Sequence, residues 1–570
     1  MPRHLTPLHK AAADAVATFA GIASTDLKVG SPPTAAMGDL AVGCHSFAKG
    51  AEAVTAAAAI VASFQPGSYL TAAIAAGPFV NFRADRPATF RWVIDAALTS
   101  SLIPRTLGTG QTICIDYGSP NISKHLAYHH VRGTTIGHAI AQIHRALGYR
   151  VVGINFLGDW GTTHGMLLAA WERWGHEVTT LDITALNGLY VHFRAAMAEN
   201  PALEGVGRAW FKRLEDGDPV ARELWQRFRD VSWAEFADVY DLLGIVYDEV
   251  RGESAYEPDL PGILQRLTAA GLLVESEGAQ VVELEGEKTP IMLRTKDGTT
   301  LYATRDVAAA EYHWREYAFT RLLYVVDRGQ ALHFRQLKKL LAKMGDEWAT
   351  RTAHVPYGLV RVGGKKTATR LGNVVLMREV FRIAEDDVRK VIAEHNPALP
   401  STTVDAVARQ VGIGAVVFAN LAPQREKDID FDIESAVSLD GDSGPYLQYS
   451  HARCASIARK AGETVTTLED VDTALLASDA EWAVARKLLD LPDMVVRAAE
   501  ACEPHIICHY LLDLAGEFSR WYTAGNGDPA QRVIVDDPAV RRARLALAAA
   551  VQAVLRDGLA LLGIAAPDQM

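Results

Sequence analysis

One unit of strand, helix and strand constrains the fold of this chain more than any other feature. The run TICIDY (residues 112–117) is rich in β-forming side chains, and apolar residues then recur from Ile136 to Leu147 at the spacing of one buried helix face. Gly148 is a natural helix end, and RVVGINF (residues 150–156) follows as a second strand. Because such crossovers are right-handed and join parallel strands, we expect a parallel sheet whose ligands bind at the carboxyl ends of its strands.

Three further regions surround this unit. Residues 1–108 alternate Ala-rich helical stretches with Gly and Pro turns and include a strand-like run, which predicts a separate α+β domain. The central domain is expected over 109–405, with a helical insertion at about 177–250. An Asp-Gly pair within 291–303 predicts a β-hairpin. From 406 to 570 the pattern is that of amphipathic helices, which predicts a helical bundle.

Composition bounds the class of protein. The chain has 570 residues, 49% of them hydrophobic, so large cores and three or four domains are expected. The five cysteines are scattered without a C-x-x-C pair, which is typical of a reducing compartment. There is no uninterrupted apolar run of about 18 residues, so we expect a cytoplasmic protein that makes no use of a membrane. The net charge of −11 does not decide whether a nucleic acid is a partner.

A series of motifs carries a resemblance to a known family. In chain order they include SPNISK, NFLGDWGTTHG, LYATRDVAAAEY, VVDRGQALHF, GLVRVGGKKTATRLGN, GDSGPYLQYSHAR and LGIAAPDQM. The chain resembles arginyl-tRNA synthetase, a class I aminoacyl-tRNA synthetase, from about Gly38 to Met570. The resemblance implies a Rossmann-type α/β catalytic domain, an N-terminal α+β domain that touches the tRNA elbow, and a C-terminal all-α bundle that binds the anticodon.

The expected amino-acid pocket must accept a guanidinium group, which is planar and carries five N–H donors. Tyr302 and Asp306 stand four residues apart, so an aromatic face and a carboxylate would project side by side at the start of a helix. By resemblance these two residues hold the guanidinium, with Glu253 as a second acceptor. The resemblance assigns the rest of the amino acid, including its α-amino and α-carboxylate groups, to Asp116, Ser119, Asn121 and Gln330.

The expected ATP site departs from the class I pattern. The family's His-x-Gly-His tetrad aligns with Ala127, Tyr128, His129 and His130, so only the last histidine remains. Loss of one such donor costs roughly 10²–10³ in rate in analogous sites, and the His129 side chain stands where a glycine leaves room for adenine. The family has a second ATP-binding loop, which is rich in lysine. The corresponding segment here is KTATR (residues 366–370).

The resemblance implies the following roles for the ATP site. The residues expected to carry catalysis are Lys124, His130 and Lys366. ATP is expected to bind together with magnesium. The residues expected to bind it are His129, His130, Gly158, Asp159, Lys365, Lys366 and Arg370.

The histidine cluster has other interpretations. His125 and His129 are four residues apart, a spacing that could present two imidazoles to a metal, but no cysteine lies nearby and no metal site is predicted. The histidines are otherwise ordinary loop residues or part of a reshaped nucleotide pocket. On the RNA side, residues 444–453 and 518–522 combine aromatic residues with arginine, a mixture that stacks on unpaired bases.

Three hypotheses for the function follow. The first is an arginine–tRNA ligase that activates arginine with ATP and transfers it to tRNA(Arg) in protein biosynthesis. The second is a repurposed paralogue that couples arginine to a small molecule or peptide without tRNA, and the altered tetrad motivates it. The third is a non-catalytic regulator that binds arginine or tRNA. The sequence alone does not choose the acceptor.

Overall fold

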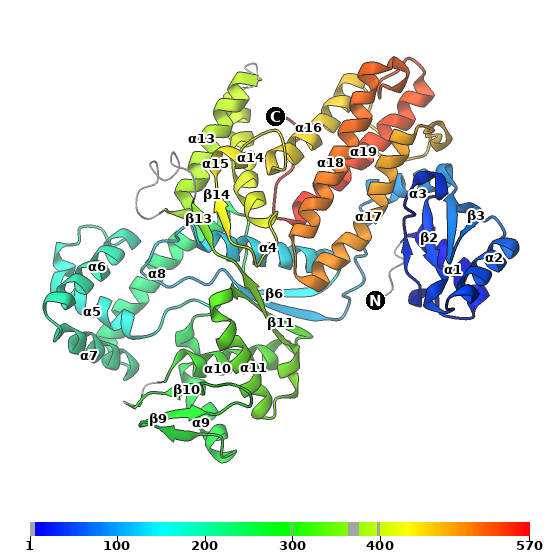
Figure 1. Ribbon diagram of the computed structural model, residues 1–570. Helices are drawn as coiled ribbons and strands as arrows, with labels where there is room; N and C mark the ends of the chain where they lie inside the picture. Colours follow the sequence, from blue (N-terminus) through cyan, green and yellow to red (C-terminus); the bar gives the residue numbers. More distant parts are fainter. Residues whose placement is uncertain (1–5, 297, 299, 363–374, 396–399) are drawn as a thin grey trace.

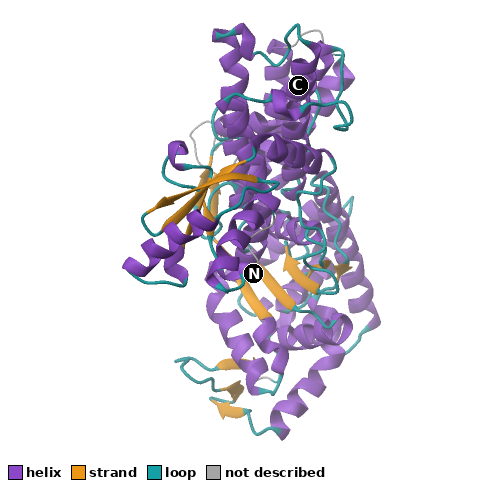
Figure 2. Ribbon diagram, turned by 90° about the vertical axis from the view of Figure 1, so that its right-hand side faces the viewer, coloured by secondary structure: helices purple, strands orange, loops and turns teal. Residues whose placement is uncertain are grey.

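The computed structural model describes residues 6–296, 298, 300–362, 375–395 and 400–570. An N-terminal domain with an antiparallel sheet lies beside a C-terminal helical bundle, and a parallel sheet with attached helices lies below the bundle in Figure 1. Figure 2 shows the central strands surrounded by helices. The overall class is therefore the expected one: a Rossmann-type α/β domain, an α+β domain and an all-α bundle.

The central sheet is parallel throughout and has the order β12-β11-β5-β6-β7. Its strands are β5 (Thr112–Tyr117), β6 (Arg150–Asn155), β7 (Glu249–Val250), β11 (Arg321–Asp327) and β12 (Thr352–Tyr357). The chain moves from β5 to β6 on one side and later returns to place β11 on the other side of β5. The carboxyl ends of β5 and β11 therefore border the crevice at which sheets of this kind bind ligands.

Helix α4 (His130–Ala146) joins β5 to β6 and matches the predicted crossover. Its apolar stripe from Ile136 to Leu147 is buried against the sheet and the bundle helices. Gly148 follows with φ +88, and a Cβ atom there would lie 1.9 Å from the carbonyl oxygen of Arg105. Glycine is therefore required at this turn both by the backbone angle and by the space available.

The N-terminal domain contains a four-stranded antiparallel sheet of order β1-β2-β4-β3. Helix α3 of this domain packs against α17 (Asp479–Ala501) and α19 (Pro538–Leu561) of the bundle, which places the domain beside the bundle in Figure 1. The elements are α1 (Pro7–Ala20), β1 (Val29–Gly30), β2 (Leu40–Gly43), α2 (Ala51–Ser63), β3 (Leu70–Ala76), β4 (Phe79–Ala84) and α3 (Arg86–Leu98).

Two groups of elements are attached to the central sheet. The first is helical, and three of its helices lie within the predicted insertion at 177–250: α5 (Thr162–Trp174), α6 (Ile183–Glu199), α7 (Leu203–Glu215) and α8 (Pro219–Leu242). The second group carries a small antiparallel sheet: α9 (Leu260–Ala269), β8 (Val274–Ser276), β9 (Ala279–Val282), β10 (Ile291–Arg294), α10 (Tyr302–Tyr317) and α11 (Ala331–Lys343).

The C-terminal part is helical apart from one short strand. Its elements are α13 (Met377–His395), α14 (Ser401–Leu421), β14 (Ile429–Phe431), α15 (Ile433–Ala436), α16 (Gly444–Ala461), α17 (Asp479–Ala501), α18 (His505–Gly527) and α19 (Pro538–Leu561). Strand β14 pairs in parallel with β13 (Val360–Val362). Helix α14 is long and apolar enough to cross a membrane, but 61% of its most apolar window is buried inside the protein, as expected for a core helix. The domain limits 1–108, 109–405 and 406–570 remain predictions.

The predicted hairpin within 291–303 is wrong for its second half. Strand β10 pairs with β9. Among the described residues, one antiparallel bridge joins Arg294 to Thr300, and the N–H of Leu301 donates to the carbonyl of Leu293 at 3.0 Å. Asp297, the first residue of the expected turn, lies outside the described residues. Tyr302 already begins helix α10, because the second alternating run is too short to compete with the amphipathic helix that follows it.

A buried arginine ties α4 to the loop that leads into β14. Arg132 is fully buried, and its guanidinium donates to the carbonyl oxygens of Asn420, Gln424, Arg425 and Lys427 at 2.9–3.2 Å. The amide of Asn420 also donates to the Tyr128 hydroxyl at 3.0 Å. A buried cation needs such acceptors, so these contacts fix the start of α4 relative to the bundle.

We predict that Arg132→Met lowers the free energy of unfolding by about 3 kcal/mol or more, because several buried carbonyl groups lose a charged donor. Urea denaturation followed by circular dichroism measures the change. The control is Arg409→Met on the exposed face of α14, which should change stability by less than about 0.5 kcal/mol. Equal effects of the two substitutions would contradict this role of Arg132.

Candidate active site

A cavity of about 300 Å³ lies at the carboxyl ends of β5 and β11. The loop after β5 forms one wall, and it is held by bridges from Asn121 to Gly158 and from Ala127 to Leu376. The residues that line the cavity include Asp116, Ser119, His129, His130, Asp327, Gln330 and Tyr357. The sheet thus brings together residues that are more than 200 positions apart in the sequence.

Asp116, near the end of β5, is a buried carboxyl group held by a neighbouring serine. The Ser119 hydroxyl donates to Oδ1 of Asp116 at 2.8 Å and accepts the N–H of Phe156 at 3.0 Å. Burial disfavours the charged form and raises the pKa of Asp116 to about 7. A cationic ligand beside this group would favour its ionised form.

The expected guanidinium contacts lie at the start of α10. Tyr302 is the first residue of the helix and is 56% exposed, and Asp306 lies one turn later. Oδ2 of Asp306 lies 2.6 Å from Nε2 of His333, whose ring centroid is 4.8 Å from that of Tyr302. His333 was not predicted as a site residue, although it lies in the VVDRGQALHF motif three positions after Gln330.

Glu253 begins a 3₁₀ segment (Glu253–Asp259) that packs against α10. Burial raises its pKa to about 8, although Arg305 opposes this rise with Nη1 3.8 Å from Oε2 of Glu253. Arg305 donates more closely to Glu257, at 2.8 Å. Glu253 is therefore a second carboxyl group whose charge is only partly compensated within the protein.

Asn121 lies in the loop after β5, where it bridges to Gly158, whereas Gln330 follows β11 and lines the cavity. Gly158 leaves room for the Asn121 side chain, because a Cβ atom at Gly158 would be 2.2 Å from Oδ1 of Asn121. Gln330 donates to Asp327 at 3.0 Å, and the N–H of Gly329 donates to the same carboxylate at 2.8 Å. These contacts order the loop after β11 and present Gln330 to the cavity.

Asp159, predicted to bind ATP, is engaged by protein groups. Its side chain has no exposed surface, and its carboxylate accepts the N–H and hydroxyl of Ser254 at 2.9 and 2.8 Å and Nε of Arg229 at 3.3 Å. These contacts hold the segment that carries Glu253. These protein groups satisfy the carboxylate, and the predicted contact of Asp159 with ATP stays a prediction.

The altered tetrad stands at the start of α4. Nδ1 of His130 lies 3.0 Å from the carbonyl oxygen of Ala127, and the ring centroids of His129 and His130 are 4.0 Å apart. Burial lowers the pKa of His129, and it lowers the pKa of His130 to about 4, so both rings are neutral near pH 7. They can offer N–H donors to phosphate oxygens but carry no charge to attract them.

Lys124, which is predicted to take part in catalysis, and His125 of the histidine cluster both contact helices of the insertion. The ammonium of Lys124 lies 5.3 Å from the ring centroid of Tyr190 in α6, and Nδ1 of His125 lies 2.9 Å from Oε1 of Glu235 in α8. Lys365, Lys366 and Arg370 lie outside the described residues, so their roles remain predictions.

Comparison with known families agrees with the fold. Residues 93–433 match the family described as "tRNA synthetases class I (R), catalytic domain", and residues 447–570 match "DALR anticodon binding domain". The first match covers more than half of the chain, which therefore belongs to the class I aminoacyl-tRNA synthetases.

Relatives narrow the family further. The chain is 42% identical over 544 residues to an arginine–tRNA ligase of an Exiguobacterium species, with 95% of each chain covered, and 42% identical to that of Lactobacillus acidophilus, with 87% of each covered. The arginyl-tRNA synthetase of Thermus thermophilus superposes with a TM-score of 0.80 at 27% identity, covering 99% of this chain and 100% of that one. The chain belongs to the arginine–tRNA ligase family.

We predict that arginine binding at pH 7 releases protons, because a bound cation lowers the pKa of Asp116 from about 7 and that of Glu253 from about 8. For the same reason, the KM for arginine should fall as the pH rises from 6 to 8.5. Calorimetry of arginine binding in phosphate and in Tris measures the protons released. Asp116→Asn should release fewer protons, and equal heats in the two buffers for the unaltered protein would contradict the prediction.

Proposed function

We propose that this arginine–tRNA ligase works in the cytoplasm and uses the described crevice for both steps of its reaction. In the first step, the arginine carboxylate attacks the α-phosphate of ATP, which gives arginyl-adenylate and pyrophosphate. In the second, a terminal ribose hydroxyl of tRNA(Arg) takes the arginyl group and AMP leaves. The burial of Asp116 near the carboxyl end of β5 and of Glu253 just after β7, each without a full cationic partner, is the observation that supports this proposal most strongly.

In this proposal the guanidinium lies between the ring of Tyr302 and the carboxylates of Asp306 and Glu253. The bond between Asp306 and His333 engages one carboxylate oxygen and orients the group. Asp116, held by Ser119, takes the α-ammonium, while Asn121 and Gln330 position the α-carboxylate. Catalysis is then mainly the positioning of the two reactants and the stabilisation of developing charge.

ATP would enter the cavity beside His129 and His130, where the amino terminus of α4 favours negative charge. Neutral His130 donates a hydrogen bond to a phosphate oxygen, and Lys124 and Lys366 supply positive charge. The His129 side chain narrows the space for adenine. Magnesium would arrive with ATP, because phosphate oxygens are its preferred ligands, and the described part of the chain contains no cluster of three metal-ligating side chains.

The comparisons give no support to the hypothesis of a repurposed paralogue with a different acceptor. The chain covers 95% of the length of a curated ligase and contains both the catalytic and the anticodon-binding region. The altered tetrad is therefore better interpreted as a local variation of the nucleotide pocket than as evidence for a small-molecule or peptide acceptor, or for a regulator without activity.

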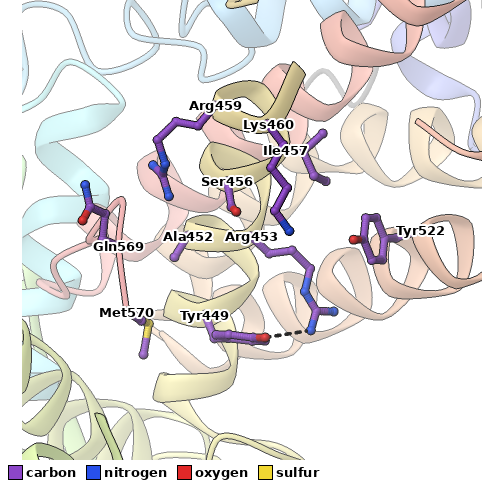
Figure 3. A pocket seen from close by; sticks show the side chains of 10 residues that line it. All are labelled: Tyr449, Ala452, Arg453, Ser456, Ile457, Arg459, Lys460, Tyr522, Gln569 and Met570. Carbon is purple, nitrogen blue, oxygen red and sulfur yellow. Dashed lines mark hydrogen bonds between the residues drawn. The ribbon is translucent and has the colours of Figure 1, made fainter. Parts of the chain in front are cut away.

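A pocket of about 430 Å³ in the bundle fits the proposed tRNA contact. Figure 3 shows that α16 supplies Tyr449, Arg453 and Lys460, that α18 supplies Tyr522, and that Met570 borders the pocket. The guanidinium of Arg453 lies 4.6 Å from the ring centroid of Tyr449 and 5.5 Å from that of Tyr522. These aromatic faces and cations suit an unpaired anticodon base and its phosphates.

We predict that Asp306→Asn raises the KM for arginine roughly 30-fold or more, because the guanidinium loses a desolvated anionic partner. The KM for ATP should stay nearly constant in pyrophosphate exchange measured with tRNA present. The matched control is Glu311→Gln on the same helix, since Glu311 pairs with Arg266 away from the crevice. A larger effect on ATP than on arginine would contradict the proposed pocket.

The anticodon contact is tested separately. Tyr522→Ala should raise the KM for tRNA(Arg) roughly 10- to 100-fold, because one stacked base is worth about 1–3 kcal/mol. Aminoacylation assays measure this change, and the KM for arginine at saturating tRNA should not change. Arg453→Ala should also weaken tRNA binding, whereas Arg497→Ala, which removes an exposed arginine of α17, should not. Equal effects of the two arginine substitutions would argue against this pocket.

A further inference from the structure

Tyr324 carries a buried hydroxyl group that the roles assigned so far do not explain. The residue lies in the middle of β11 and is only 5% exposed, and its ring centroid is 4.7 Å from that of Phe334. Among the described residues, its hydroxyl has no hydrogen-bond partner. Buried polar groups are normally paired, so an unpaired hydroxyl in the strand that borders the ligand cavity suggests a partner that comes with a ligand.

The sheet register places this residue beside the amino-acid pocket. Tyr324 is the direct neighbour of Asp116 in the pairing of β11 with β5, and paired residues of adjacent strands present their side chains on the same face of the sheet. That face is covered by α10 and α11, which carry Asp306 and His333, and Tyr324 belongs to the same buried cluster as Val307 of α10.

Charge effects agree with this placement. Burial raises the pKa of the Tyr324 hydroxyl well above its usual value, and the carboxylates of Asp306 and then Asp116 raise it further. The hydroxyl therefore stays protonated and neutral, close enough to both carboxylates to be affected by their charge. A neutral hydroxyl can accept one hydrogen bond and donate another.

We propose that the Tyr324 hydroxyl is a substrate-binding group that accepts an N–H from the guanidinium of arginine. This inference rests on the proposed function of the crevice. A guanidinium has five N–H donors, more than Asp306 and Glu253 alone satisfy in a planar arrangement, and a neutral acceptor adds a bond without adding a further buried charge. The guanidinium is favoured over the α-ammonium because the Tyr324 ring packs on Phe334 of α11 and belongs to the same buried cluster as Val307 of α10, and these two helices carry His333 and Asp306.

The test is Tyr324→Phe, which removes only the hydroxyl and keeps the ring that packs on Phe334. We expect the KM for arginine in pyrophosphate exchange with tRNA to rise roughly 10- to 100-fold, the effect of losing a hydrogen bond to a charged group. The KM for ATP and the midpoint temperature of thermal unfolding should not change appreciably. An unchanged KM for arginine would overturn the inference.

Tyr117→Phe is the matched control. Tyr117 is also buried and its hydroxyl also lacks a partner among the described residues, but it follows Asp116 in β5 and so points to the opposite face of the sheet. Its substitution should leave the KM for arginine unchanged. Equal rises for the two variants would overturn the inference, because they would indicate a general effect on the sheet.

Two inhibitors distinguish which group of arginine contacts the Tyr324 hydroxyl. Inhibition by butylguanidine, which has the guanidinium alone, should weaken in Tyr324→Phe, whereas inhibition by norvaline, which has only the α-amino and α-carboxylate groups, should not. The reverse result would overturn the assignment to the guanidinium. Failure of the unaltered protein to activate arginine would instead refute the proposed function, so the two failures are distinguishable.

Discussion

The site depends on buried carboxyl groups that lack a close cationic side chain for each negative charge. Asp116 and Glu253 lie where burial raises their pKa values to about 7 and about 8, and Asp306 shares a hydrogen bond with a histidine. A buried carboxyl group in this condition is stabilised when a cation with several N–H donors arrives. A preference for a guanidinium thus follows from where the fold buries acidic groups.

The rest of the fold holds these groups in place. The parallel sheet supplies Asp116, helix α10 supplies Asp306, and the fully buried carboxylate of Asp159 fixes the segment that carries Glu253. The bundle also takes part, because Arg425 donates to the carbonyl of Pro356 and its own carbonyl accepts the N–H of Gly358 at 2.8 Å. Glu503, at the corner before α18, in turn pairs with Arg425 at 3.2 Å. The segment that carries Tyr357 and Gly358, which line the cavity, is therefore tied through Arg425 to Glu503 in the C-terminal bundle.

Periodicity predicted the central unit well, because the stripe from Ile136 to Leu147 is long and is buried throughout on one face. It failed at the expected hairpin, where a short alternating run yields to helix α10. Family motifs indicated Tyr302 and Asp306, but the partnership with His333 depends on how α10 packs against α11, which no local pattern encodes. Likewise, the sequence does not distinguish a carboxylate that faces a ligand from one that is enclosed, and Asp159 is of the second kind.

A crystal structure of the protein with arginine tests the central claim most directly. The account predicts that the guanidinium lies within hydrogen-bond distance of Asp306 and against the ring of Tyr302, with the α-ammonium beside Asp116. Arginine bound elsewhere, or bound in this crevice with its guanidinium directed away from Asp306 and Glu253, would contradict it.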